Sequence, residues 1–107
     1  MERQIKIIGE LKQKLIENLG DNVVNLILFG SQINGKATEF SDYDILIVLK
    51  NEFDWVLRNK IYSISYDIEL EYEILFDTTI ISLYELNQTL RGKQPFILNA
   101  LHNGIAA

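Results

Sequence analysis

Hydrophobic positions at the start of the chain predict a helix followed by a strand. Apolar side chains in residues 2–19 recur at intervals of three and four, the spacing of an amphipathic helix; they are Ile5, Ile8, Leu11, Leu15 and Leu19. Gly20-Asp21-Asn22 follows as a stop signal. Residues 23–29 are apolar except for Asn25 and rich in branched side chains, so they predict a buried strand.

The middle of the chain continues this alternation. Residues 31–37 are short and polar and predict one or two helical turns. Residues 42–49 are polar at the start and apolar to the end, which predicts a second strand. Residues 52–68 return to helical spacing and predict a second amphipathic helix.

The period changes again from Glu69 onward. Three glutamates alternate there with apolar residues, and a branched run continues as far as Ile81, which predicts a third strand whose start lies somewhere within 65–72. Residues 83–90 and 94–103 predict two further helices.

The predicted order is therefore α-β-α-β-α-β-α. Strands that alternate with helices favour a small mixed β-sheet packed with helices, in the α/β (α+β) class. A length of 107 residues suits a single domain over residues 1–107, because two cores of half that size would be marginally stable.

Composition and charge exclude several classes of protein. Cysteine is absent, which excludes a disulfide scaffold, a thiolate nucleophile and a Cys-ligated metal. The net charge of −5 would repel a nucleic-acid backbone, so general nucleic-acid binding is disfavoured. The longest apolar run, Ile45 to Leu49, is too short for a membrane span, and the N-terminus does not resemble a secretory signal. We therefore expect no membrane association and a cytoplasmic location.

Gly30-Ser31 is the first element with candidate chemistry. Glycine lets the backbone approach a ligand closely, and the polar turns that follow offer unpaired N–H groups to phosphate oxygens. The Ser31 hydroxyl can donate one more hydrogen bond. Taken alone, a Gly-Ser pair after a strand is more often a simple turn.

Asp42 and Asp44 form the second element. Two positions apart at the start of a strand, they lie on one face, with Cα atoms roughly 6.7 Å apart, while Tyr43 faces the opposite side of the sheet. Both carboxylates can then bind one divalent cation, or share two about 3.5–4 Å apart. Because the rest of the strand is apolar, a metal would also remove the cost of two unpaired carboxylates. The more ordinary interpretation of such a pair is a solvated strand end or a cap.

Together these residues resemble a known family. Gly30-Ser31, ten residues and then Asp42-Tyr43-Asp44 resemble the Gly-Ser-x10-Asp-x-Asp signature of the DNA polymerase β-like nucleotidyltransferase superfamily. The small size and the stretch 96–105 are similar to its minimal nucleotidyltransferase (MNT) branch, and the similarity runs from Leu26 to Gly104. The resemblance implies the nucleotidyltransferase fold and a transferase of EC 2.7.7 type. Such an enzyme moves a nucleoside monophosphate, here AMP from ATP, to an acceptor hydroxyl and releases pyrophosphate.

The resemblance also assigns roles to residues. Gly30 and Ser31 would hold the β- and γ-phosphates, and Asp42 and Asp44 would coordinate two Mg²⁺ ions as metal-binding catalytic residues. These oxygen ligands suit Mg²⁺, and two cations stabilise both the attacking and the leaving oxygen of an in-line displacement.

The superfamily places a third metal-binding and catalytic carboxylate on a neighbouring strand. Asp77, between apolar residues, matches that pattern best, with Glu71 next and Glu73 behind; all three share a face if the strand is unbroken.

The sequence departs from the family in the short helix. Relatives commonly carry Arg there, whereas this chain has Gln32 and Asn34, whose neutral amides cannot fork a phosphate as a guanidinium does. Lys36 is the candidate replacement for nucleotide binding, although an exposed lysine on a solvated turn is the more ordinary interpretation.

The resemblance finally suggests a partner. Minimal nucleotidyltransferases are often paired with small helical HEPN-domain proteins in toxin–antitoxin systems, where they act as antitoxins and in some systems add AMP to a tyrosine of the toxin. The alternative function is a catalytically weak or inactive binding module that neutralises its partner by contact. A third hypothesis, transfer onto a small molecule, would need a homo-oligomer that builds an acceptor pocket.

Overall fold

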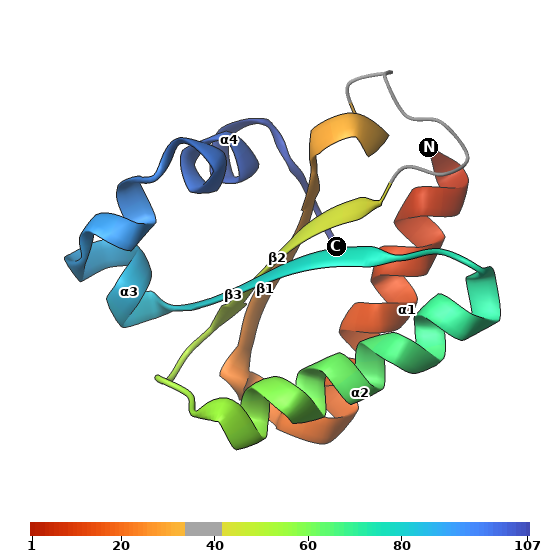
Figure 1. The fold of residues 1–107 in the computed structure, drawn as a ribbon, viewed down its shortest axis with the longest axis horizontal. Helices are drawn as coiled ribbons and strands as arrows, with labels where there is room; N and C mark the ends of the chain where they lie inside the picture. Colours follow the sequence, from red (N-terminus) through yellow and green to blue (C-terminus); the bar gives the residue numbers. More distant parts are fainter. Residues whose placement is uncertain (34–41) are drawn as a thin grey trace.

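A four-stranded sheet with helices on both faces forms the protein, and the computed structural model describes it for residues 1–33 and 42–107 (Figure 1). The helices are α1 (Glu2–Leu19), α2 (Trp55–Tyr72), α3 (Leu83–Gln88) and α4 (Pro95–Asn103). The strands are β1 (Val23–Phe29), β2 (Tyr43–Leu49), β3 (Phe76–Ser82) and β4 (Ile105–Ala106). Short 3₁₀ turns are η1 (Gly20–Asn22), η2 (Gly30–Gln32) and η3 (Leu90–Lys93).

The strand order is β3-β2-β1-β4, which confirms the predicted mixed sheet. β1 pairs antiparallel with β2 and with β4, whereas β2 pairs parallel with β3. A parallel pair needs a crossover connection, and α2 supplies it. Within the described residues, no helix is both long and apolar enough to cross a membrane.

Both faces of the sheet are buried, which explains why β1 and β2 are apolar almost throughout. On one face, α1 and α2 pack with side chains that include Leu26 and Ile45 (Figure 1). On the other, α4 packs through Ile97 and Ala100 against a second set that includes Ile27 and Leu46. Successive residues of one strand therefore enter different cores, as the two-residue period of a strand requires.

The predicted start of the third strand is wrong. α2 continues to Tyr72, so Glu71 lies in its last turn, and the helix ends at Glu73 in the left-handed conformation (φ 55°, ψ 47°). The segment is helical because Ile61, Ser65 and Ile68 recur at helical spacing on one buried face of α2. The burial of this face outweighs the short alternation of glutamates, which alone would favour a strand. Glu71 and Glu73 are consequently not on β3.

Two other boundaries have local causes. The helix predicted over 52–68 begins later, because the Asp54 side chain caps it by accepting a hydrogen bond from the Leu57 N–H (3.0 Å). The short strand β4 was not predicted, because two residues are too few to show a period. It pairs with Ile27 and Leu28, and Gly104 before it leaves no room for a Cβ, which would lie 2.3 Å from the Ile27 side chain.

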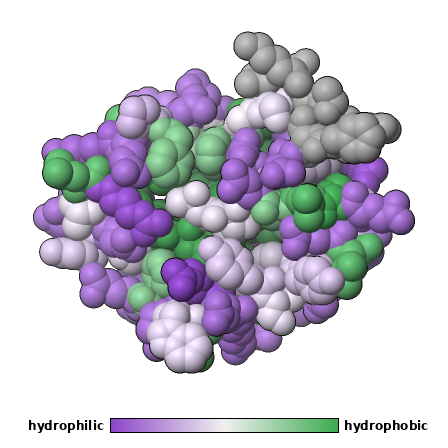
Figure 2. Space-filling model, in the orientation of Figure 1, coloured by the Kyte–Doolittle hydropathy of each residue, from purple (hydrophilic) through white to green (hydrophobic). Residues whose placement is uncertain are grey.

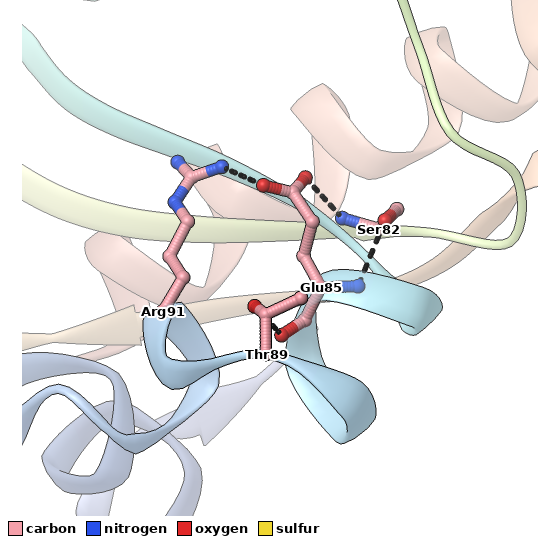
Figure 3. Close-up of polar contacts among 4 residues, drawn as sticks. All are labelled: Ser82, Glu85, Thr89 and Arg91. Atoms are coloured by element: carbon pink, nitrogen blue, oxygen red, sulfur yellow. Dashed lines mark hydrogen bonds and ion pairs between the residues drawn. The ribbon is translucent and has the colours of Figure 1, made fainter.

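A capping box ties α3 to η3 (Figure 3). The Ser82 hydroxyl accepts from the Glu85 N–H (3.1 Å), and the Glu85 carboxylate accepts from the Ser82 N–H (3.3 Å) and from Arg91 (2.6 Å). Burial alone would raise the pKa of Glu85, but the hydrogen bonds from Arg91 and Ser82 outweigh it and lower that pKa below its usual value. Thr89 adds a bond to the Glu85 carbonyl (2.7 Å), so this end of β3 is firmly held.

A hydrogen bond from the Tyr72 hydroxyl to the Glu10 carboxylate joins α2 to α1. It raises the pKa of Tyr72 to about 12 and lowers the pKa of Glu10 below its ordinary 4.5. An acid with a lowered pKa stabilises the folded state above its unfolded pKa and loses that contribution as the pH falls.

We therefore expect Tyr72→Phe to lower the thermal unfolding midpoint at pH 7, and we expect the difference from wild type to shrink below about pH 4. Melting curves at the two pH values test this. Tyr66→Phe, which changes an exposed tyrosine on the same helix, is the matched control. An equal difference at both pH values would contradict the assigned role of Glu10.

Candidate active site at the ends of three strands

The carboxyl end of β1 and the amino ends of β2 and β3 lie next to one another at the same end of the sheet. Phe29, the residue before Gly30, pairs with Asp44, and Asp44 pairs in turn with Asp77. Neighbouring strands lie about 4.8 Å apart. Asp44 therefore stands between the Gly30 turn and Asp77, which brings together three of the residues that the sequence proposed.

Asp44 and Asp77 also point to the same face. Asp44 is two positions from Leu46, and Asp77 is four positions from Ile81, and both of those residues belong to the core beneath α4. Tyr43, between the aspartates, enters the opposite core, is only 5% exposed and meets the Phe76 ring edge-on at 6.1 Å. The predicted orientation of Tyr43 is confirmed, and its burial fixes Asp44 toward the other side.

Gly30 lies directly against the Asp44 carboxylate. Its φ is +75°, and a Cβ at this position would lie 2.1 Å from an Asp44 carboxylate oxygen. No side chain fits there without moving Asp44, so the glycine both forms the left-handed turn and makes the close approach possible. Ser31 follows in η2 and is half-buried.

The surroundings of Asp44 disfavour its ionised form. Burial raises the pKa of Asp44, and the charge of Asp77, hydrogen bonding with the Asp77 side chain and the charge of Asp42 raise it further. The neighbouring negative charges therefore disfavour the ionised form of Asp44, and a divalent cation bound beside it would offset them.

The donor set fits Mg²⁺, which prefers carboxylate oxygens and keeps several ligands for water and phosphate. Among residues 1–33 and 42–107, no three side chains of the Asp, Glu, His or Cys types group closely enough to hold a metal unaided. Asp44 and Asp77 form the central pair, and Asp42 is an exposed residue just before β2. Water and triphosphate oxygens would complete the coordination.

The remaining candidates fall elsewhere. Glu71 and Glu73 line a cavity with Arg3 and Lys6 of α1, so neither glutamate can be the third carboxylate on a strand. Lys36 and Asn34 lie outside the described residues.

Gln32 of η2 is 7% exposed, and its side-chain oxygen accepts a hydrogen bond from Gln4 of α1 (3.3 Å). Gln32 therefore helps to anchor η2 to α1, which sequence reasoning did not foresee.

Sequence reasoning also missed polar residues of α2 beside Asp77. A cavity of about 600 Å³ is lined by Asp77 and Thr78 of β3 and by Tyr62, Tyr66 and Glu69 of α2, among others. The available signal was a second set of helical spacings, since positions 62, 66 and 69 follow one another at intervals of four and three.

Residues 9–104 match the family described as Polymerase beta, Nucleotidyltransferase. The chain belongs to this family. The family match confirms the recognition from the sequence signature.

Two relatives come from Methanocaldococcus jannaschii. One, named "Putative protein adenylyltransferase MJ1305", is 32% identical over 93 residues, which cover 80% of this chain and 63% of that protein. The other, named "Putative protein adenylyltransferase MJ0141", is 37% identical over 76 residues, which cover 71% of this chain and 77% of that protein. The chain thus spans less than two thirds of the first relative.

Two solved structures share the fold. One is a mutant of the toxin–antitoxin MntA-HpeT, with a TM-score of 0.57 and 15% identity, covering 92% of this chain and 69% of that one. The other is a toxin–antitoxin with AMP-PNP, with a TM-score of 0.55 and 17% identity, covering 91% and 69%. These likenesses confirm the nucleotidyltransferase fold.

The carboxylate pair predicts a metal-dependent change in stability. In EDTA, Asp44→Asn should raise the unfolding midpoint by about 2–5 °C, because it removes one of two repelling carboxylates; this corresponds to roughly 0.5–1 kcal/mol. Added Mg²⁺ should stabilise the wild type and leave Asp44→Asn unchanged. Differential scanning fluorimetry measures both effects, with the exposed Asp67→Asn as the control of equal charge change. Equal Mg²⁺ responses in the two variants would contradict this metal site.

The close approach at Gly30 predicts a stability loss for a single added methyl group. Gly30→Ala should cost at least about 1 kcal/mol, because alanine disfavours a positive φ and its Cβ would collide with Asp44. Gly9→Ala is the matched control: that helical glycine has nothing within 4 Å of an added Cβ, and alanine there should stabilise by up to about 1 kcal/mol. Urea denaturation compares them, and a neutral Gly30→Ala would show that Asp44 moves freely.

Proposed function

We propose that this chain transfers AMP from ATP to a hydroxyl group on a partner protein. The observation that carries the proposal is the Asp44–Asp77 pair beneath Gly30, at one edge of a sheet in a nucleotidyltransferase-family chain. The two relatives are named as protein adenylyltransferases, and one of the solved structures contains AMP-PNP; both facts support ATP as the substrate.

Phosphate binding and metal binding would fall to different residues of the site. Gly30 and Ser31 would hold the β- and γ-phosphates, because the glycine lets the backbone approach without a side chain. Asp44 and Asp77, with Asp42, would hold up to two Mg²⁺ ions, which neutralise the negative charge that develops on the attacking and leaving oxygens. Lys36 is the candidate for further charge on the triphosphate.

In the reaction the acceptor oxygen forms a bond to the α-phosphorus of ATP, and the bond from that phosphorus to the bridging oxygen of the β-phosphate breaks. Pyrophosphate leaves with the electron pair of the broken bond. We assign the acceptance of the hydroxyl proton to the Asp77 carboxylate, and the exposure of Asp77 on the outermost strand of the sheet supports this role.

The partner we propose is a small helical toxin of the HEPN type, with this chain as its antitoxin. The two solved structures described above are toxin–antitoxin proteins, which supports the setting, and the HEPN identity follows from the family resemblance. A tyrosine hydroxyl of the toxin is the expected acceptor.

The second candidate function is neutralisation of the partner by contact without transfer. The observation that favours it is Gln32, a neutral residue bound to Gln4 in the short turn after Gly30-Ser31, where the family resemblance implies an Arg. A site with less positive charge binds a triphosphate more weakly.

Labelled ATP distinguishes the two functions. With Mg²⁺ and the helical protein encoded next to this chain, we expect label from the α-phosphate on that protein. Asp44→Asn or Asp77→Asn should lower the transfer rate by at least about a hundredfold, since each removes a proposed metal ligand. Asp67→Asn, an exposed residue of α2, is the control and should retain full rate. A wild type as inactive as both variants, yet still bound to its partner, would favour neutralisation by contact.

A further inference from the structure

The outer edge of β3 is an open strand edge beside Asp77. Among residues 1–33 and 42–107, β3 pairs with β2 alone, since the strand order places it at the end of the sheet. Tyr43 donates its N–H to the Leu75 carbonyl (2.9 Å), which fixes the parallel hydrogen-bond pattern: odd-numbered residues of β3 bond toward β2, and even-numbered ones point their N–H and C=O outward.

Within the described residues, the outward N–H groups at the two ends of β3 are occupied. The Ser82 N–H donates to the Glu85 carboxylate (3.3 Å). The Phe76 N–H donates to the Glu69 carboxylate (2.8 Å). Within the described part of the chain, no hydrogen bond reaches the outward backbone groups of Thr78 and Ile80. An unpaired edge of this kind is a template for an additional strand.

This edge lies in a groove with two walls. Tyr62 of α2 and Thr78 of β3 line both the 600 Å³ cavity next to Asp77 and a second cavity of about 330 Å³, so the two cavities adjoin along β3. The second is also walled by Arg91, Gln94 and Phe96, from η3 and the start of α4. Because the edge is recessed between walls, a single extended segment can reach it, whereas a second folded sheet with its own walls would meet them first.

An exposed stripe of three aromatic residues and one leucine runs along α2, the helix that forms one wall of the groove. Trp55, Tyr62, Tyr66 and Leu70 are spaced by seven, four and four residues, which places them on one side of the helix, and they are 66%, 43%, 57% and 61% exposed. This stripe is separate from the buried face of α2. Figure 2 looks onto β3, and the surface over the middle of this strand mixes pale and hydrophobic residues with a few strongly hydrophilic ones.

The charges of the groove differ between its ends. Asp77 and Glu69 are at one end, and Arg58 and Arg91 line the other. Arg91 is paired with Glu85, whereas the Arg58 guanidinium makes no hydrogen bond or ion pair among the described residues. The groove therefore suits a segment that brings an acidic side chain toward Arg58.

We propose that this groove binds an extended segment of the acceptor protein as an added strand of the sheet, with the acceptor hydroxyl opposite Asp77 and an acidic residue opposite Ile80. The inference rests on the proposed transfer to a protein hydroxyl and adds how the acceptor is held. Main-chain hydrogen bonds to Thr78 and Ile80 would supply affinity, and side-chain contacts would supply selectivity.

The geometry sets the spacing of the two side chains. Asp77 and Ile80 are three residues, or about 10 Å, apart along β3. Side chains three apart in an added strand point to opposite faces, so the hydroxyl reaches the Asp77 face while the acidic group faces α2 and Arg58. The matching segment is hydroxyl-x-x-acid or the reverse.

The test uses fluorescein-labelled nonapeptides of Val, Thr and Ser that contain Tyr-x-x-Glu or Glu-x-x-Tyr, and the same peptides with Lys in place of Glu. Binding is measured by anisotropy up to about 1 mM peptide, with neither ATP nor Mg²⁺ present. We expect the Glu peptide in one of the two orders to bind and to slow hydrogen exchange at the Thr78 and Ile80 amides.

Two matched pairs of variants sharpen the test. Thr78→Pro removes an outward N–H that β2 does not use and should weaken peptide binding at least tenfold, whereas Thr78→Val keeps that N–H and should change the affinity less than about twofold.

Arg58→Glu should weaken binding of the Glu peptide and strengthen binding of the Lys peptide, each about fivefold. Lys60→Glu makes the same charge change on α2 at a residue that does not line the groove, and it should do neither.

Absence of amide protection with every peptide would overturn the inference, as would equal binding to Thr78→Pro and Thr78→Val. A wild-type dimer that Thr78→Pro dissociates would show that a second copy occupies the edge. Because no nucleotide is present, these results are independent of the transfer reaction. Adenylylation of the intact partner that survives Thr78→Pro unchanged would overturn the docking mode and leave the proposed function in place.

Discussion

The parallel pairing of β2 with β3 is the constraint on which the rest of the site depends. Its register sets Asp44 beside Asp77, and the antiparallel register with β1 sets the Gly30 turn on the other side of Asp44. A shift by one residue would send the aspartates into the opposite core and Tyr43 into the site. The apolar residues of both cores therefore hold the carboxylates in place without touching them.

This arrangement works against stability at one point. Asp44 is partly buried and next to another carboxylate, and its raised pKa records that unfavourable position. Strained groups of this kind persist where the surrounding structure overdetermines them, and they gather at functional sites. Here Tyr43, buried against Phe76, supplies the opposing packing.

Much of the fold and the centre of the site could be predicted from sequence, since β1 and β2 have long apolar runs and the Gly-Ser and Asp-x-Asp pairs flank them. The end of α2 could not, because five alternating residues fit a helix end as well as a strand, and only the burial of Ile68 and its neighbours decides between them. For the same reason Glu71 and Glu73 were wrong candidates, while Asp77 is on β3. The β3 groove depends on side chains from α2, β3 and η3, a juxtaposition that no local pattern contains.

The crossover through α2 determines when, during folding, Asp44 and Asp77 come together. The whole of α2 lies between Asp44 and Asp77 in the sequence. Closing so long a connection costs conformational entropy, and this cost is offset only once β2 and β3 have paired. During synthesis, β1, its turn and β2 emerge well before β3. The two aspartates would then meet only when the crossover closes, so any molecule that contacts both would favour the native state over forms in which β3 has not yet paired with β2.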